Sequence, residues 1–203
     1  MKLLRSFLAD EQGGPAAEFA LVLPLALLFL FGIIDVGRFM WDVNQSEKAT
    51  QTGARWAVTT DILASDLIDY SFAVDGGIPQ GEPVDADAFP GVRCNSDGCE
   101  CLDGGSCGFD ATAFDGDAFA DLVTRMAQIK PDISADNVLV NYAWSGLGYA
   151  GDPNGPDVAP IVTISLQNMT FTPLLLQLFG GEVDLPDYSY SLTMEDGYGS
   201  YAN

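Results

Sequence analysis

The sequence predicts an α+β protein: a long N-terminal helix, first transmembrane and then amphipathic, precedes an exported domain with an antiparallel sheet and short helices. Two observations lead to this fold class. An apolar run near the N-terminus, residues 19–34, contains no charged side chain. The remainder combines short β-rich runs with amphipathic stretches that turn residues separate. At 203 residues, the chain has room for about one domain besides this helix.

Composition and charge exclude several classes of protein. The chain is 48% hydrophobic and 18% charged, so it is too apolar to be disordered. Its net charge is −21, and residues 56–203 carry 23 acidic side chains against three basic ones. Such a domain repels phosphate, which excludes nucleic acid as a partner and disfavours anionic membrane surfaces. Histidine is absent, which removes the commonest general base and the commonest zinc ligand.

The apolar run is long enough to cross a bilayer. Its 16 residues make about 24 Å of helix, and with Val36 added they can span a hydrocarbon core of about 30 Å. Lys2 and Arg5 precede the run and the acidic domain follows it, so the N-terminus is expected in the cytoplasm. A cleaved signal peptide is disfavoured, since the run ends in GIID at residues 32–35 without small residues of the Ala-x-Ala type. A plain single-pass anchor is the simpler alternative.

Glu18 is the residue that a plain anchor does not explain. A carboxylate at the edge of a bilayer costs free energy unless it finds a partner, becomes protonated or reaches the headgroups. The residues around it are a polar leader ending in Gly13, then GPAA at 14–17, then Glu18 and the apolar run. This arrangement resembles a type IV prepilin, in which a membrane peptidase cuts after a glycine and glutamate becomes the fifth residue of the mature chain.

That resemblance implies a role for each of these residues. Cleavage after Gly13 would make Gly14 the first residue, although Gly14 also offers a second possible cut. The new α-amino group would then pair with the Glu18 carboxylate of a neighbouring subunit, so that each charge compensates the other. Pro15 departs from the pattern, because a small residue such as alanine is expected at the second mature position.

A closer resemblance lies in three stretches: EFALVLP at residues 18–24, FGIIDVGR at 31–38 and ATQTGARWA at 49–57. They are similar to the signature of TadE-like proteins, the pseudopilins of tight-adherence pilus systems. Two snippets farther along, FTPLL at 171–175 and TMED at 193–196, are weaker reminders of the same family. The resemblance makes Glu18, Phe19 and Pro24 candidate assembly residues.

The resemblance implies a minor pilin or pseudopilin that assembles through its helix. Its expected partners are the membrane, other pilins or pseudopilins, the inner-membrane platform of the pilus and a prepilin peptidase. It would cross the bacterial inner membrane once, with its C-terminal domain periplasmic, or extracellular in a filament. One alternative is an unprocessed, membrane-tethered binding domain, and an exported hydrolase is a third hypothesis.

Three regions follow from this interpretation. Residues 1–13 form the cytoplasmic leader, residues 14–58 the pilin-like helix, and residues 59–203 the acidic exported domain. Pro24 lacks an N–H and is expected to kink or loosen the helix. Gly53 and Ala54 are small enough for close packing, either on another helix or on the protein's own domain.

Periodicity predicts the elements of the outer domain. An amphipathic helix is expected over residues 115–130 and ends at Pro131. Three β-rich runs, at 138–144, 161–166 and 188–194, predict an antiparallel sheet. A brief helix is expected to begin at Thr172-Pro173 and end at Gly180-Gly181, with its leucines in the core, because about seven apolar residues cannot span a bilayer.

The stretch 75–108 is rich in glycine, proline and aspartate and is interpreted as a long loop held by cysteines. It contains all four cysteines: Cys94, Cys99, Cys101 and Cys107. In an exported domain they predict two disulfides with three possible connectivities, of which pairing between Cys99 and Cys101 is disfavoured. A four-thiolate metal site is the rival interpretation, but this spacing is not a zinc-ribbon pattern.

The sequence indicates no enzyme, and we name no catalytic residue, metal site or cofactor. It lacks histidine, a G-x-S-x-G motif and a phosphate-binding loop, and its cysteines are expected to be paired. The segment DPNGPD at residues 152–157 offers oxygen ligands and could hold calcium. It lacks the full twelve-residue loop, however, and an Asn-Gly turn between prolines explains it.

Overall fold

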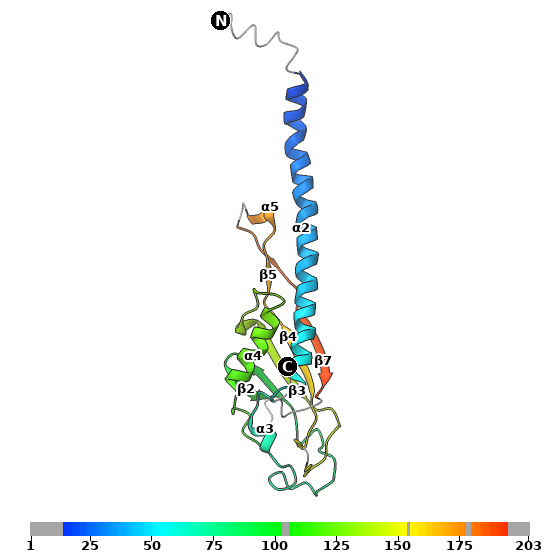
Figure 1. Cartoon of the computed structure of the whole chain (residues 1–203), viewed down its shortest axis with the longest axis vertical. Coiled ribbons are helices and arrows are strands. Elements are labelled where there is room, and N and C mark those ends of the chain that lie inside the picture. The colour runs from blue at the N-terminus through cyan, green and yellow to red at the C-terminus, as the bar shows by residue number, and fades with distance from the viewer. Residues whose placement is uncertain (1–13, 103–105, 154, 178–179, 195–203) are drawn as a thin grey trace, which may run out of the picture. The chain divides into compact units, whose positions relative to one another are not determined.

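The computed structural model describes residues 14–102, 106–153, 155–177 and 180–194, so the predicted leader with Gly13 lies outside the described residues. The element order confirms the α+β class, with a long helix before an antiparallel sheet and short helices (Figure 1). The chain forms two compact units. Unit 1 contains Met1–Asp42 and Thr170–Val183, and unit 2 contains Val43–Met169 and Asp184–Asn203.

The first described element is α2, Gly14–Ala57, a helix of 44 residues that continues without interruption through Pro24. It is long and apolar enough to cross a membrane. Along residues 14–34 every side chain is exposed except that Gly32 is half-buried. The apolar side chains of this part therefore have lipid or another protein, and not the chain's own core, as their expected surroundings.

The part of α2 that belongs to unit 2 is packed instead of exposed. Its buried residues recur every three or four positions, as an amphipathic helix requires: Ser46, Ala49, Thr50, Gly53, Ala54 and Ala57. A Cβ added to Gly53 would lie 2.7 Å from the Met126 sulfur and 3.5 Å from a methyl group of Ile164. Gly53 thus permits close packing on the protein's own domain, which confirms the second of the two uses predicted for it.

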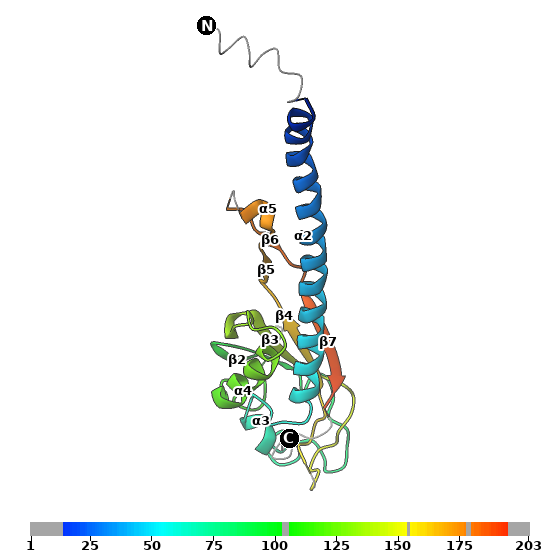
Figure 2. The same ribbon diagram turned by 45° about the horizontal axis from the view of Figure 1, so that its top comes forward.

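Unit 2 is built on a five-stranded antiparallel sheet in the order β2-β1-β3-β4-β7 (Figure 2). The strands are β1 Val92–Asn95, β2 Gly98–Cys101, β3 Val138–Ala143, β4 Ile161–Leu166 and β7 Tyr188–Thr193. Burial alternates strictly along β3, so one face of the sheet carries the core. The strands predicted from the last three β-rich runs are confirmed.

Helix α4, Gly116–Ala127, supplies the other half of this core through Phe119, Leu122 and Met126. It begins where the sequence predicts because the Asp115 carboxylate accepts hydrogen bonds from the backbone N–H groups of residues 117 and 118. The short elements are α3 Asp66–Asp69, the 3₁₀ helix η3 Ala135–Asn137, β5 Thr170–Phe171, α5 Leu174–Gln177 and β6 Val183–Asp184. Strands β5 and β6 pair as a separate two-stranded sheet.

Two expectations are corrected. The stretch 75–108 is not only a loop, because β1 and β2 form a hairpin inside it and join the main sheet through β3. The leucines of α5 are not in the core: no residue of this helix is buried. Their apolar character led to a prediction of burial, whereas the segment leaves the main sheet after β4 and belongs to unit 1.

Tyr142 joins the sheet to the segment that follows α2. Its side chain is fully buried, and its hydroxyl oxygen accepts a hydrogen bond of 3.1 Å from the backbone N–H of Leu63. Burial raises the pKa of Tyr142, so the phenol stays neutral in the core. This bond satisfies a donor that would otherwise be buried without a partner.

Replacing Tyr142 by phenylalanine is expected to lower the free energy of unfolding by about 1 to 3 kcal/mol, because the Leu63 N–H stays buried and loses its acceptor. Chemical denaturation of the full chain in micelles, followed by tryptophan fluorescence, measures the loss. Tyr190→Phe, at a half-buried position on edge strand β7, is the matched control and should stay within about 0.5 kcal/mol of the parent. Equal losses in both variants would contradict the role given to Tyr142.

Candidate functional site

The candidate assembly residues share the exposed first turns of α2. Gly14 is the first residue of the helix, and a Cβ added to it would meet no other atom within 4 Å. Glu18 and Pro24 are exposed, and Phe19 keeps 65% of its surface accessible. These side chains lie within two to three turns of one another, on a surface whose other members are almost all apolar. Such a surface suits helix–helix contact inside a membrane.

Asp35 is the first charged residue after the apolar run, and it is only 8% exposed although its neighbours on α2 are exposed. One carboxylate oxygen accepts a 2.8 Å hydrogen bond from the backbone N–H of Leu174, and the other accepts one of 3.1 Å from Leu175. The guanidinium group of Arg38, one turn along α2, lies 3.2 Å from the first oxygen. Both oxygens of a charge at the end of the apolar run are therefore satisfied.

These contacts give α5 the cap that its own sequence lacks. The first N–H groups of any helix have no partner within it, and Pro173, just before α5, offers no capping side chain. Asp35 supplies the acceptor from another part of the chain. Hydrogen bonds to a charged acceptor contribute about 1.5 to 3 kcal/mol, so this capping is a substantial contribution for a helix of four residues.

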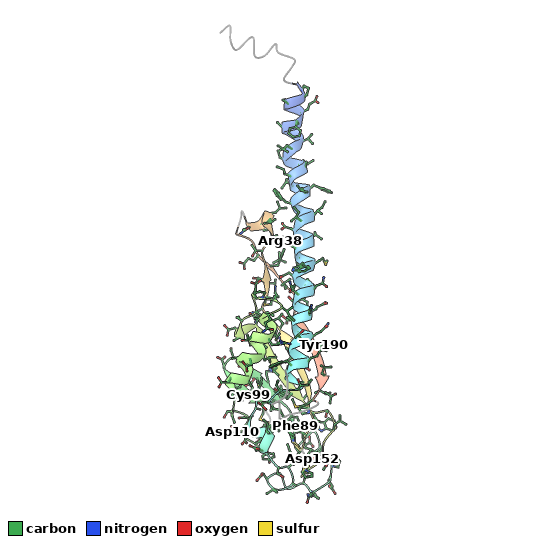
Figure 3. All side chains as sticks on the ribbon, viewed as in Figure 1. Arg38, Phe89, Cys99, Asp110, Asp152 and Tyr190 are labelled. Atoms are coloured by element: carbon green, nitrogen blue, oxygen red, sulfur yellow. A yellow bond between two sulfur atoms is a disulfide. The ribbon has the colours of Figure 1, made fainter. Side chains whose placement is uncertain are left out.

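Arg38 and Phe39 complete the contact on the side of β5. Arg38 also donates a hydrogen bond of 3.5 Å to the carbonyl oxygen of Thr172, and its guanidinium carbon lies 5.3 Å from the centre of the Phe171 ring (Figure 3). The Phe39 ring meets the same Phe171 ring edge-on at 5.5 Å. We call this set the Asp35 cluster: Asp35, Arg38, Phe39, Phe171, Thr172, Leu174 and Leu175.

Sequence reasoning did not find this cluster. Both halves of it lie inside quoted stretches, FGIIDVGR at 31–38 and FTPLL at 171–175, but nothing in either indicates that they meet. One signal was available: Asp35 stands alone at the end of a charge-free run, where an unpaired carboxylate is costly. That signal asks for a partner without saying which segment provides it.

The four cysteines form two disulfides, Cys94–Cys99 and Cys101–Cys107, as predicted in number. The first bridges directly opposed residues of the β1–β2 hairpin, and the second closes the segment after β2. The disfavoured pair Cys99–Cys101 is not formed. The two bonds close loops that are adjacent and separate, so each one holds one edge of the sheet independently of the other.

The acidic segment at 152–157 has a structural use. Asp157 is 4% exposed, and its carboxylate accepts hydrogen bonds from the backbone N–H groups of Phe72, at 2.7 Å, and Asp152, at 2.9 Å. Asn154 of the predicted turn lies outside the described residues. In the described part of the chain, no three His, Cys, Asp or Glu side chains gather as metal ligands would.

Comparison with known proteins supports the resemblance found in the sequence. A family model described as TadE-like protein matches residues 13–55. The match contains Glu18, Phe19 and Pro24 together with Asp35 and Arg38, and it confirms the similarity to TadE-like proteins over this segment. It ends before the outer domain and does not include the β5–α5 half of the Asp35 cluster. No curated protein and no solved structure matches the chain.

The disulfide pairing predicts a specific peptide pattern. Cleavage after Glu100 separates Cys99 from Cys101, so a digest after glutamate without reduction should release a peptide ending at Glu100 and another beginning at Cys101 as separate species. Each should carry one internal disulfide, which mass spectrometry detects. The other two connectivities would leave these peptides covalently joined, and a joined product would therefore contradict the structure.

Proposed function

We propose that this protein is a minor pilin or pseudopilin of a tight-adherence pilus system, inserted in the membrane through α2 and acting by helix–helix assembly. Two observations support the proposal. Residues 13–55 match TadE-like proteins, and the membrane-length part of α2 presents its apolar side chains away from the chain's own core. The second observation carries the mechanism, because an exposed apolar helix with one carboxylate has a surface left over for identical or related helices.

Glu18 is the residue that lipid alone does not satisfy. Apolar neighbours such as Phe19 and Val22 are equally content with acyl chains or with another helix, since both surroundings are apolar. A carboxylate at the same depth gains only from a partner of opposite charge. The α-amino group of a neighbouring mature chain is such a partner, and pairing with it gives both the attraction and the axial register of one helix against the next.

Processing creates that partner. A prepilin peptidase on the cytoplasmic side would cut after Gly13, and Gly14 would then carry the free amine at the first residue of α2. The protein would remain in the inner membrane with a single span and a periplasmic C-terminal domain until the pilus platform engages the helix. The outer domain, with its sheet and two disulfides, would accompany the helix into or beside the filament.

The first prediction concerns the charge of Glu18. Glu18→Gln keeps the shape and removes the charge, which leaves the neighbouring amine unpaired. An unpaired charge of this kind costs about 2 to 5 kcal/mol, so filament formation, or incorporation into filaments, should fall by more than about tenfold. Sheared pilus fractions and membrane fractions, probed for the protein, give the two amounts to compare.

Glu47→Gln provides the control, because it makes the same chemical change at an exposed position of the same helix beyond the membrane-length part. This variant should assemble as the parent does, and both variants should insert in the membrane to the same extent. Unchanged assembly of Glu18→Gln would instead favour a single-pass tether that carries an extracytoplasmic binding domain and does not polymerise.

The second prediction concerns the mature N-terminus. Intact-mass and N-terminal peptide analysis of protein taken from its native membrane should show a chain beginning at Gly14, shorter than the full sequence by residues 1–13. A chain beginning at Met1 would contradict processing. A chain beginning at Pro15 would move the cut to the second glycine and make Glu18 the fourth residue, which alters the geometry of the proposed ion pair.

A further inference from the structure

The short helix α5 is unusually apolar for its exposure. Three of its four residues are leucines, yet none is buried: Leu174 and Leu176 keep 37% and 40% of their surface accessible, and Leu175 is half-buried. Val183, at the start of β6, is 39% exposed as well. Neighbouring exposed apolar side chains of this kind mark a contact surface on a protein.

The charge pattern around α5 differs from that of the rest of the outer domain. Between Asp157 and Glu182 the sequence contains no aspartate, glutamate, lysine or arginine, although the chain as a whole carries a net charge of −21. The excursion from β5 through α5 thus lacks the acids that would be repelled by lipid headgroups or would resist transfer out of water. Only polar, uncharged side chains interrupt it.

The Asp35 cluster fixes the depth of this surface. Asp35 directly follows the charge-free run 19–34, so it lies at the outer end of a segment whose length of about 24 Å fits the hydrocarbon core. Its carboxylate holds the N–H groups of Leu174 and Leu175 at 2.8 and 3.1 Å. Within unit 1, both ribbon views place α5 beside α2, at the end of the β5–β6 excursion (Figures 1 and 2).

We infer that α5 is a second membrane contact, in which Leu174 and Leu176 enter the boundary between headgroups and acyl chains of the bilayer that α2 crosses. The inference rests on α2 spanning a membrane and is independent of cleavage and polymerisation. Four residues cannot span, but interfacial segments bury apolar side chains only about 5 to 10 Å deep. The leucines that sequence analysis assigned to the core thus have lipid as their apolar surroundings.

The cluster is suited to that depth because it leaves little polarity unsatisfied. The carboxylate of Asp35 is balanced by the guanidinium of Arg38, and the N–H groups at the start of α5 have an acceptor. Near a bilayer, unpaired backbone groups and unpaired charges are the main obstacles to insertion. A capped, uncharged turn beside a spanning helix avoids both.

Continuity favours lipid over a second protein as the occupant. The exposed apolar surface of α2 ends at Ile34, and α5 adds leucines beside the very next residue, so that one apolar region extends from the span to the excursion. A second copy of the chain would also present apolar side chains. The experiment below is chosen because it separates lipid from protein as well as from water.

The test places a nitroxide label at Leu176→Cys in the full chain, reconstituted in vesicles of zwitterionic phosphatidylcholine. All four native cysteines are in disulfides, so only the introduced thiol reacts. Collision of the label with oxygen, which concentrates in lipid, is compared with collision with a water-soluble nickel chelate. Leu147→Cys, 56% exposed in an acidic part of unit 2, provides the aqueous reference, and Leu25→Cys, 72% exposed in the apolar run, provides the lipid reference.

The ratio of oxygen to nickel collisions at Leu176→Cys should exceed that at Leu147→Cys severalfold and approach that at Leu25→Cys. A ratio equal to the aqueous reference overturns the inference. Low collision with both reagents also overturns it, since that result means the site is covered by protein, as a second copy would cover it. If Leu25→Cys itself reports water, the membrane span fails together with the inference, which distinguishes the two failures.

Leu174→Cys repeats the measurement at the other exposed leucine, so a defect peculiar to one labelled site does not decide the result. A further variant tests the part played by Asp35. Asp35→Asn in the Leu176→Cys background should lower the ratio severalfold, because a neutral amide with one acceptor oxygen holds α5 less firmly. Glu47→Gln should leave the ratio unchanged, and an equal ratio in Asp35→Asn would show that Asp35 does not set the depth of α5.

Discussion

A single helix has to satisfy two different surroundings, and the rest of the structure depends on how α2 does so. Along residues 14–34 its side chains are exposed and nearly all apolar, which only lipid or another apolar helix can accommodate. From Val43 onward it presents small residues, such as Ala49, Gly53 and Ala54, to the core of unit 2. No break in the helix separates the two regimes. The change is made entirely by side-chain size and polarity.

Asp35 stands where the first regime ends, and its neutralisation makes the change possible. A lone carboxylate at this point would draw water toward the end of the apolar run. In the Asp35 cluster the carboxylate is instead shared between Arg38 and the N–H groups of a remote segment. The contact has two benefits, because it satisfies the charge on α2 and also caps α5, whose own sequence provides no cap.

The sequence predicted the parts of the fold whose signals are local. The charge-free run of α2, the alternation of β3 and the Asp115 cap of α4 each depend on residues a few positions apart, so periodicity and capping rules locate them. The β1–β2 hairpin was missed because its strands, VRCN and GCEC, have few apolar residues. Their order comes from cross-strand partners, the disulfide and β3.

The leucines of α5 show the other limit of sequence reasoning. A run of leucines is usually core, and that rule fails here because the segment is held by a carboxylate 139 positions away in sequence. A contact at such a separation has no periodic signature. The assembly residues Glu18, Phe19 and Pro24 were identified from a motif and not from geometry, and their exposure on α2 agrees with that role without testing it.

Charge also decides where the attraction in the proposed assembly must come from. Residues 56–203 contain 23 acidic and three basic side chains, so the outer domains of neighbouring copies repel one another. Physiological salt screens this repulsion beyond about 8 Å but does not turn it into attraction. The apolar part of α2 is uncharged between Glu18 and Asp35, and Asp35 is already neutralised by Arg38. Glu18 is thus the one carboxylate of this part that is left for a partner, and the assembly must be driven by apolar helix packing and aligned by that charge.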